Sequence, residues 1–307
     1  MNWIVGALTL FFVSVLVHWC GVATLSRTLG SSQAQIFGMG LATIAALPAY
    51  SVAWWRQSAN PWPARLTQSA LGLGASGLAL RWVESYRLAD GIGHVPISNL
   101  YEVFVLFVLI VGAMQLRLQS RRDLANLGAF LAPIGSAAVA FLFWYALARG
   151  GHEQAPLVPA LDSYWMKLHV PANFIGYGAF CLAAMCSLAW LAADLPFAEV
   201  RLPAKKALEQ ASYSLIAVGF VAFTVATVLG ALWAAEAWGG YWSWDPKETW
   251  ALVVWLNYAA WLHLRLVGGG RRNRLLAWWS LVGLLITLFA FLGVNIYLSG
   301  LHSYGAL

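Results

Sequence analysis

The sequence predicts an all-α protein, a polytopic membrane helical bundle of about nine transmembrane helices. Hydrophobic residues make up 61% of the 307 positions and charged residues 10%, against roughly 45–50% and about 25% in soluble domains. The apolar residues gather in runs long enough to cross a bilayer, which takes about 20 helical residues. The connections between these runs are short, so we expect a single membrane domain over residues 1–307.

Nine segments reach that length with few charges. They are residues 2–23, 34–55, 67–84, 100–116, 126–147, 169–193, 210–233, 250–267 and 275–299. The first has no basic leader and no clear small-residue cleavage site, so we expect a retained helix rather than a signal peptide. The third is the weakest because Arg81 and Glu84 lie near its end, and without it the count falls to eight.

Lysine and arginine in the short loops predict the orientation, because cytoplasmic loops carry an excess of these residues. Twelve of the 18 basic residues lie at the end of, or follow, the second, fourth, sixth and eighth segments: Arg56, Arg65, Arg117, Arg121, Arg122, Arg201, Lys205, Lys206, Arg265, Arg271, Arg272 and Arg274. We therefore expect a cytoplasmic N-terminus and an outer C-terminus. The stretch around His169, the loop 234–250 and the tail with His302 then share the outer face. On this interpretation the net charge of +6 reflects topology rather than nucleic-acid binding.

The loop 234–250 is unusually aromatic. Four tryptophans fall within thirteen positions: Trp238, Trp242, Trp244 and Trp250. An interfacial aromatic belt is the simpler explanation, but a belt does not account for Gly239 and Gly240 among the rings. Glycine lets a backbone approach a ligand closely, and the faces of Tyr241 and its tryptophan neighbours are flat and apolar. We expect this loop to be a platform for a large planar ligand.

The second half of this motif resembles a helix start. Asp245 can cap the eighth segment, Pro246 suits its first helical position, and Glu248 completes a capping box. We therefore expect Asp245 and Glu248 mainly to set the angle between loop and helix. Lys247 could meet a carboxylate of the ligand, although an exposed lysine is as often simply solvated.

Trp238 to Trp250 resembles the tryptophan-rich WWD signature of the haem-handling proteins of cytochrome c maturation. The run Trp242-Ser-Trp-Asp-Pro-Lys-Glu-Thr-Trp250 is similar to the CcsA branch, also called ResC, of system II. The system I relatives CcmC and CcmF share the Trp-Gly…Trp-Asp core of the signature but differ after the Asp. Further matches lie at Pro96–Glu102, Leu168–Pro171, Leu262–Arg265, Gly293–Asn295 and Gly300–Gly305.

The resemblance implies haem b as cofactor and a haem-binding loop at 234–250, with contacts from Trp238, Gly239, Gly240, Tyr241, Trp242, Trp244 and Asp245. It also implies two outer axial histidines. Imidazole is a common haem ligand, and His169, at the start of the sixth segment, and His302, after the ninth, match the family's positions. We expect them to hold the outer haem iron from both sides of the ring.

His263 is predicted to lie within the eighth segment, about 20 Å below its outer end at 1.5 Å per residue. An ionisable group at that depth is a functional candidate, and the resemblance makes His263 a ligand of an inner haem iron. His18 lies only about 8 Å from the outer end of its own segment, too far from His263 to share one iron. The second inner ligand is therefore expected from the CcsB (ResB) partner protein.

The remaining candidates have weaker cases. His18 is expected to be packed in the bundle and His152 solvated. His94 could shuttle a proton or line the site, although a loop histidine usually does neither, and Glu102 is given no role. Three cysteines fall in apolar runs without a paired motif, and we expect them to be buried: Cys20, Cys181 and Cys186.

The resemblance implies a subunit of a cytochrome c synthase that moves haem outward and presents it for thioether attachment to the Cys-x-x-Cys-His motif of apocytochrome c. A thiol-reducing partner is expected as well. We find no acid–base dyad. The chain would therefore position haem and protect its redox state, while the cofactor supplies the chemistry. Two alternatives stay open: a haem transporter without ligation activity, and a structural membrane subunit with an interfacial aromatic loop.

Overall fold

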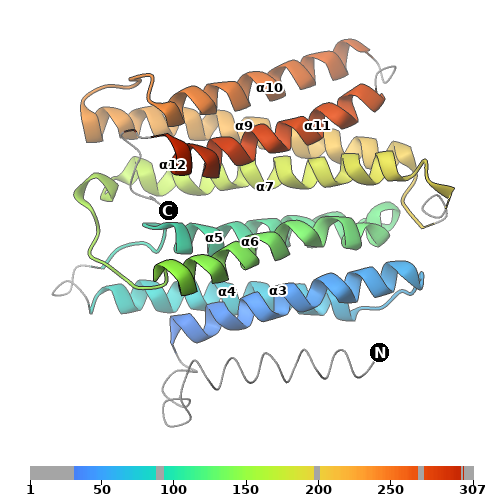
Figure 1. The fold of residues 1–307 in the computed structure, drawn as a ribbon, viewed down its shortest axis with the longest axis horizontal. Coiled ribbons are helices and arrows are strands. Elements are labelled where there is room, and N and C mark those ends of the chain that lie inside the picture. Colours follow the sequence, from blue (N-terminus) through green and yellow to red (C-terminus); the bar gives the residue numbers. More distant parts are fainter. Residues whose placement is uncertain (1–30, 88–92, 197–200, 269–272, 299, 301–307) are drawn as a thin grey trace, which may run out of the picture.

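The structure is a computed structural model that describes residues 31–87, 93–196, 201–268, 273–298 and 300. These residues form a bundle of long helices without strands (Figure 1). The predicted helix 2–23, with His18 and Cys20, lies outside the described residues, and so does His302.

All eight predicted segments that fall on described residues are helical. The long helices are α3 (Ser32–Trp55), α4 (Trp62–Ser85), α5 (Leu100–Gln119), α6 (Gly128–Arg149), α7 (Tyr164–Ala192), α9 (Lys205–Trp238), α10 (Pro246–Gly268) and α11 (Asn273–Leu288). A π-helical segment, η3 (Phe289–Gly293), continues α11 into the short α12 (Val294–Tyr297). Among the described residues, seven helical stretches are long and apolar enough to cross a membrane, and α4 is not one of them. The polytopic all-α bundle is confirmed.

Local sequence signals explain several helix ends. The Ser163 side chain accepts a hydrogen bond from the Trp165 N–H at 3.2 Å, which caps α7, and Asn99 caps α5 in the same way. This N-terminus of α7 lies five residues before the predicted start, so His169 is in the second turn and does not begin the helix. At the other end of α9, Gly239 adopts a left-handed conformation with φ of 79° and terminates the helix.

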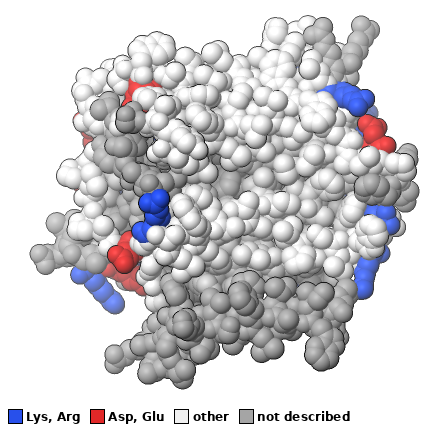
Figure 2. Space-filling view, viewed as in Figure 1, with Lys and Arg blue, Asp and Glu red and all other residues white. Residues whose placement is uncertain are grey.

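The helix α7 runs through the centre of the bundle and packs against α5, α6, α9 and α11 (Figure 1). The pair α3–α4 lies on one side of it, and α9 and α10 lie on the other. Successive helices run in opposite directions, so the connections after α3, α5, α7 and α10 share one end, which we call the basic end. The loop 239–245 lies at the opposite, aromatic end. Figure 2 shows an uncharged belt between charged ends.

The charges that weaken α4 as a membrane segment are satisfied inside the bundle. Arg81 and Glu102 form an ion pair at 2.6 Å, with side chains 1% and 2% exposed. Glu84 accepts a hydrogen bond from the Ser32 N–H at 2.9 Å, at the start of α3. The third segment is therefore a helix of the bundle in spite of its low hydropathy.

Candidate functional site

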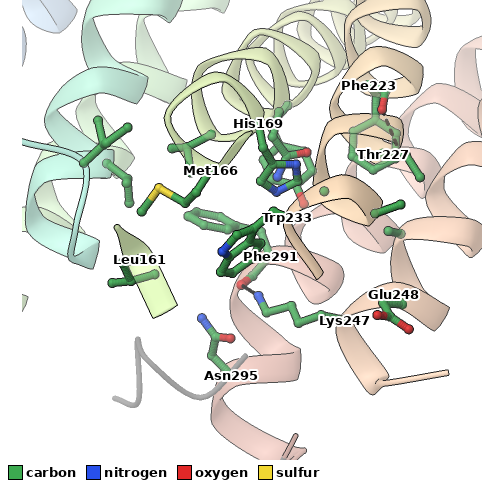
Figure 3. A pocket seen from close by; sticks show the side chains of 18 of the residues that line it. Leu161, Met166, His169, Phe223, Thr227, Trp233, Lys247, Glu248, Phe291 and Asn295 are labelled. Atoms are coloured by element: carbon green, nitrogen blue, oxygen red, sulfur yellow. Dashed lines mark hydrogen bonds between the residues drawn. The ribbon is translucent and has the colours of Figure 1, made fainter. Parts of the chain in front are cut away.

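A cavity of about 230 Å³ lies at the aromatic end of the bundle. Its walls come from the start of α5, from α7 and α9, from the aromatic loop with the first turn of α10, and from η3 and α12 (Figure 3). Most lining side chains are apolar. A few polar groups converge among them: Ser98, Asn99, His169, Asn173, Thr227, Lys247, Glu248 and Asn295. An apolar cavity with a small number of placed polar groups is typical of a ligand site.

His169 is half-buried in the cavity wall, where α9 fixes its ring. Its Nδ1 atom lies 2.7 Å from the carbonyl oxygen of Ala226. A carbonyl can only accept, so Nδ1 carries the proton, and Nε2 carries the lone pair in the neutral ring. The ring also stacks on Trp233, with centroids 6.1 Å apart and planes inclined by 29°. A histidine held through one nitrogen by a carbonyl has the arrangement typical of a metal ligand.

Gly230 gives the imidazole its space. A Cβ atom built on Gly230 would lie 2.8 Å from Cε1 and 2.9 Å from Nδ1 of His169. Side chains do not approach so closely, so glycine at this point of α9 allows the ring to lie against the helix backbone. No pattern in the sequence marks this contact, because the two residues lie on different helices.

The structure divides the aromatic loop between three surroundings. Tyr241 and Trp242 line the cavity. Trp238 packs on Trp233, with ring centroids 5.0 Å apart. Trp244 points away, with 68% of its surface exposed, and meets Trp242 edge-on at 5.8 Å. The predicted platform is thus not one continuous surface in this structure.

Gly239 and Gly240 do not line the cavity. Gly239 terminates α9, and a Cβ at either position would meet nothing within 4 Å. The expected close approach of the backbone to a ligand therefore has no counterpart in the geometry here.

Asp245 and Glu248 form the expected capping box at the start of α10. The Asp245 carboxylate accepts the Lys247 N–H at 2.9 Å, and Glu248 accepts the Asp245 N–H at 3.2 Å. Both side chains are buried. Asp245 is not among the cavity-lining residues, whereas Glu248 is.

Lys247 is in the cavity wall rather than solvated. Its Nζ atom donates to the carbonyl oxygens of Phe291, at 2.8 Å, and Ala290, at 3.3 Å (Figure 3). Both carbonyls belong to η3, where the π-helical turn shifts the regular backbone pairing. Lys247 therefore joins the first turn of α10 to η3, and both elements border the cavity.

His263 lies apart from the cavity. It follows Pro246 by seventeen residues, about 25 Å along the helix, so it is closer to the basic end than predicted. Its side chain is exposed on the outer surface of α10. On the same helix face Val253, Leu256 and Leu266 are also exposed, so His263 is a polar residue within an apolar surface.

The other candidates also have defined environments. His94 Nε2 lies 3.3 Å from Ser98 Oγ. His152 is half-buried and its Nδ1 lies 2.9 Å from the Ala146 carbonyl oxygen, so the prediction that it is solvated is wrong. The loop that carries His152 is fixed by Arg81, which donates to the carbonyl oxygen of His152. Cys181 and Cys186 are buried, as predicted.

Sequence reasoning missed several cavity residues, including Met166, Asn173, Tyr177 and Phe291. Asn173 had a usable signal, because it is a polar residue one helical turn after His169 and therefore on the same face of α7. The aromatic and methionine residues had none, since apolar side chains in membrane helices are common.

Comparisons with known proteins show the family of the chain. Residues 97–302 match a family described as cytochrome C assembly protein. The chain is similar to cytochrome c biogenesis protein CcsA of Parasynechococcus marenigrum (strain WH8102), with 38% identity over 88% of this chain and 94% of that protein. CcsA of Guillardia theta is 35% identical over 74% of this chain and 80% of that protein.

Among solved structures, cytochrome c haem lyase CcmF has a similar fold, with a TM-score of 0.64 and 18% identity. The match covers 85% of this chain and 48% of CcmF, so the chain spans about half the length of that protein.

Proposed function

Because the chain belongs to the CcsA family of cytochrome c biogenesis proteins, we propose that its aromatic-end cavity binds haem and presents it for covalent attachment to apocytochrome c. Family membership assigns the chain to c-type cytochrome maturation, and its apolar helices make it an integral membrane protein. The haem site, the ligands and the orientation are the proposal.

The orientation of His169 carries this proposal. Its Nδ1–H is held by the Ala226 carbonyl, so the neutral ring has the tautomer that binds iron through Nε2. Trp233 stacks on the ring and limits its rotation. The cavity beside it is mainly apolar, which suits a macrocycle and excludes water. These residues fit haem as a ligand.

We assign the second outer ligand to His302. It follows Asn295, a cavity-lining residue of α12, by seven positions. The chain beyond α12 therefore starts beside the cavity and is long enough to bring an imidazole to it. Haem supplies the iron and the vinyl groups that form thioethers with the Cys-x-x-Cys-His motif. The protein orients it through His169 and His302 and keeps water away through the apolar walls.

We assign His263 to a second, inner haem site. Its exposure on an apolar face of α10 supports a site completed by another membrane protein, which we identify with the CcsB (ResB) partner. With the basic end in the cytoplasm, haem would move from His263 to the cavity at the outer face. A thiol-reducing partner would keep the acceptor cysteines reduced.

The test is the visible spectrum of the protein purified with its bound haem. We expect His169→Ala, His302→Ala and His263→Ala each to alter the Soret band, and added imidazole to restore it where a ligand was lost. His152→Ala is the matched control, because His152 does not line the cavity. A wild-type protein that stays colourless with abundant haem would contradict the proposal.

Reconstitution separates ligation from transport alone. The wild-type protein, combined with its partner and a Cys-x-x-Cys-His polypeptide, is expected to form covalent cytochrome c, and His169→Ala is expected to fail. Haem release to the medium without covalent product would instead favour the transporter.

A further inference from the structure

Trp244 has a backbone conformation that its side chain disfavours. Its φ angle is 59°, in the left-handed region, where a bulky residue is an outlier and glycine is the usual choice. Packing does not compensate, because 68% of the Trp244 surface is exposed. Some other interaction must therefore hold this conformation.

Glu248 provides that interaction. Its Oε2 atom accepts hydrogen bonds from the Ser243 N–H at 2.7 Å and from the Asp245 N–H at 3.2 Å. These are the backbone groups on the two sides of Trp244. One carboxylate oxygen in a concave pair of N–H groups is the arrangement called a nest, which binds anions. The peptide groups flanking Trp244 are thus fixed by a side chain in the first turn of α10.

A helix cap alone does not explain this geometry. In a capping box the glutamate, here Glu248, accepts a hydrogen bond only from the N–H of the capping residue, Asp245. The shorter bond here goes to Ser243, which lies before the capping residue. Thr249 adds a bond from its hydroxyl to the Trp244 carbonyl at 3.3 Å. The contacts converge on residue 244 rather than on the helix end.

We propose, on the basis of the proposed haem site, that Glu248 is a positioning residue for the tryptophan pair at the cavity. By holding Trp244 in the left-handed conformation, it sets Trp242 in the cavity wall and Trp244 edge-on to it and outward, with the two planes at 89°. Without the carboxylate, residue 244 returns to an ordinary φ and Trp242 leaves the wall.

Hydrogen–deuterium exchange of the purified, haem-free protein tests this directly. We expect Glu248→Ala to raise amide exchange in residues 239–250 about tenfold, because the two bonded N–H groups lose their acceptor and Trp244 also loses the support of its left-handed conformation. Glu248→Gln, which keeps an acceptor oxygen, should change it less. Glu153→Ala, an exposed carboxylate in another loop of the aromatic end, is the control and should leave exchange in 239–250 unchanged.

The same substitution in a Trp244→Gly protein separates positioning from capping. Glycine adopts the left-handed conformation without support, so Glu248→Ala should then raise exchange only about threefold. An equal rise in both backgrounds, or no rise in the original one, would overturn the proposal. If the alanine variant fails to fold, the glutamine variant in both backgrounds gives the same comparison.

A second readout uses the haem-loaded protein. Trp244→Gly and Trp244→Ala both lack the indole, but only alanine resists the left-handed conformation. We expect the Soret band of Trp244→Gly to lie closer to that of the wild type than that of Trp244→Ala, and identical bands would count against the proposal. A colourless wild type would contradict the proposed haem function, whereas the exchange result would still decide the role of Glu248.

Discussion

The Nδ1 atom of His169 and the carbonyl oxygen of Ala226 lie 2.7 Å apart, across the interface of α7 and α9. The contact joins His169, which the sequence marks as a candidate ligand, to a backbone group 57 positions later. The imidazole is thereby oriented by α9 rather than by its own helix, so the packing of α7 on α9 determines where the proposed ligand points.

Gly230→Ala is expected to disturb this orientation. The new Cβ would lie 2.8 Å from the imidazole, and an overpacked contact of this kind costs about 1–3 kcal/mol. We expect bound haem to fall about tenfold, with partial rescue by imidazole, measured from the Soret absorbance per protein. Gly72→Ala is the control, because a Cβ there meets nothing within 4 Å; unchanged haem in Gly230→Ala would contradict the role given to α9.

Lys247→Met is expected to destabilise the protein by about 1–3 kcal/mol, because two partly buried carbonyls of η3 lose their donor. Unfolding in mixed micelles, followed by circular dichroism, measures this. Lys167→Met, which breaks an exposed pair with Asp162, should cost about 0–1 kcal/mol. An equal loss of unfolding free energy in the two variants would show that the bridge between α10 and η3 stabilises the protein no more than an exposed ion pair does.

Arg81→Met is expected to cost about 3–5 kcal/mol, since it leaves the Glu102 carboxylate buried without its cation. The double variant Arg81→Met/Glu102→Met should lose less, because neither charge remains in the interior. The same micelle unfolding assay measures both. A double variant less stable than the single one would mean that the pair itself, rather than the unpaired charge, dominates.

His263→Ala is expected to leave the free energy of unfolding within about 0.5 kcal/mol of the wild type, because the side chain is exposed. Haem at the outer cavity, measured with His169 intact, should be retained in a preparation loaded directly from solution. Haem acquired inside cells should fall, because the inner site would be lost. Equal loss by both routes would argue against two separate sites.

Local chemistry made part of this structure predictable. The start of α10 follows from Asp245, Pro246 and Glu248, which act within a few residues of one another. Hydropathy located the helices but shortened those with polar ends: α9 begins at Lys205, before the predicted residue 210, because its first turns carry charges. Hydropathy measures the apolar length of a helix and not its hydrogen-bonded length.

The arrangement of the aromatic loop was not predictable in the same way. A loop has no side-chain period, so nothing in the sequence indicates that Trp242 faces the cavity while Trp244 faces outward. That division depends on the backbone N–H groups that donate to Glu248 and on the packing of Trp238 on Trp233. Likewise, the exposure of His263 depends on which face of α10 its neighbours cover.

The buried pair between α4 and α5 has a consequence for how the chain enters the membrane. Arginine unpaired at the centre of a spanning helix costs about 2.5–3.5 kcal/mol on insertion scales, and less near an end. The ribosome completes α4 before the residue that neutralises Arg81 has been made. We therefore expect stable integration of α4 to require α5, with the two helices entering the bilayer as a hairpin rather than one at a time.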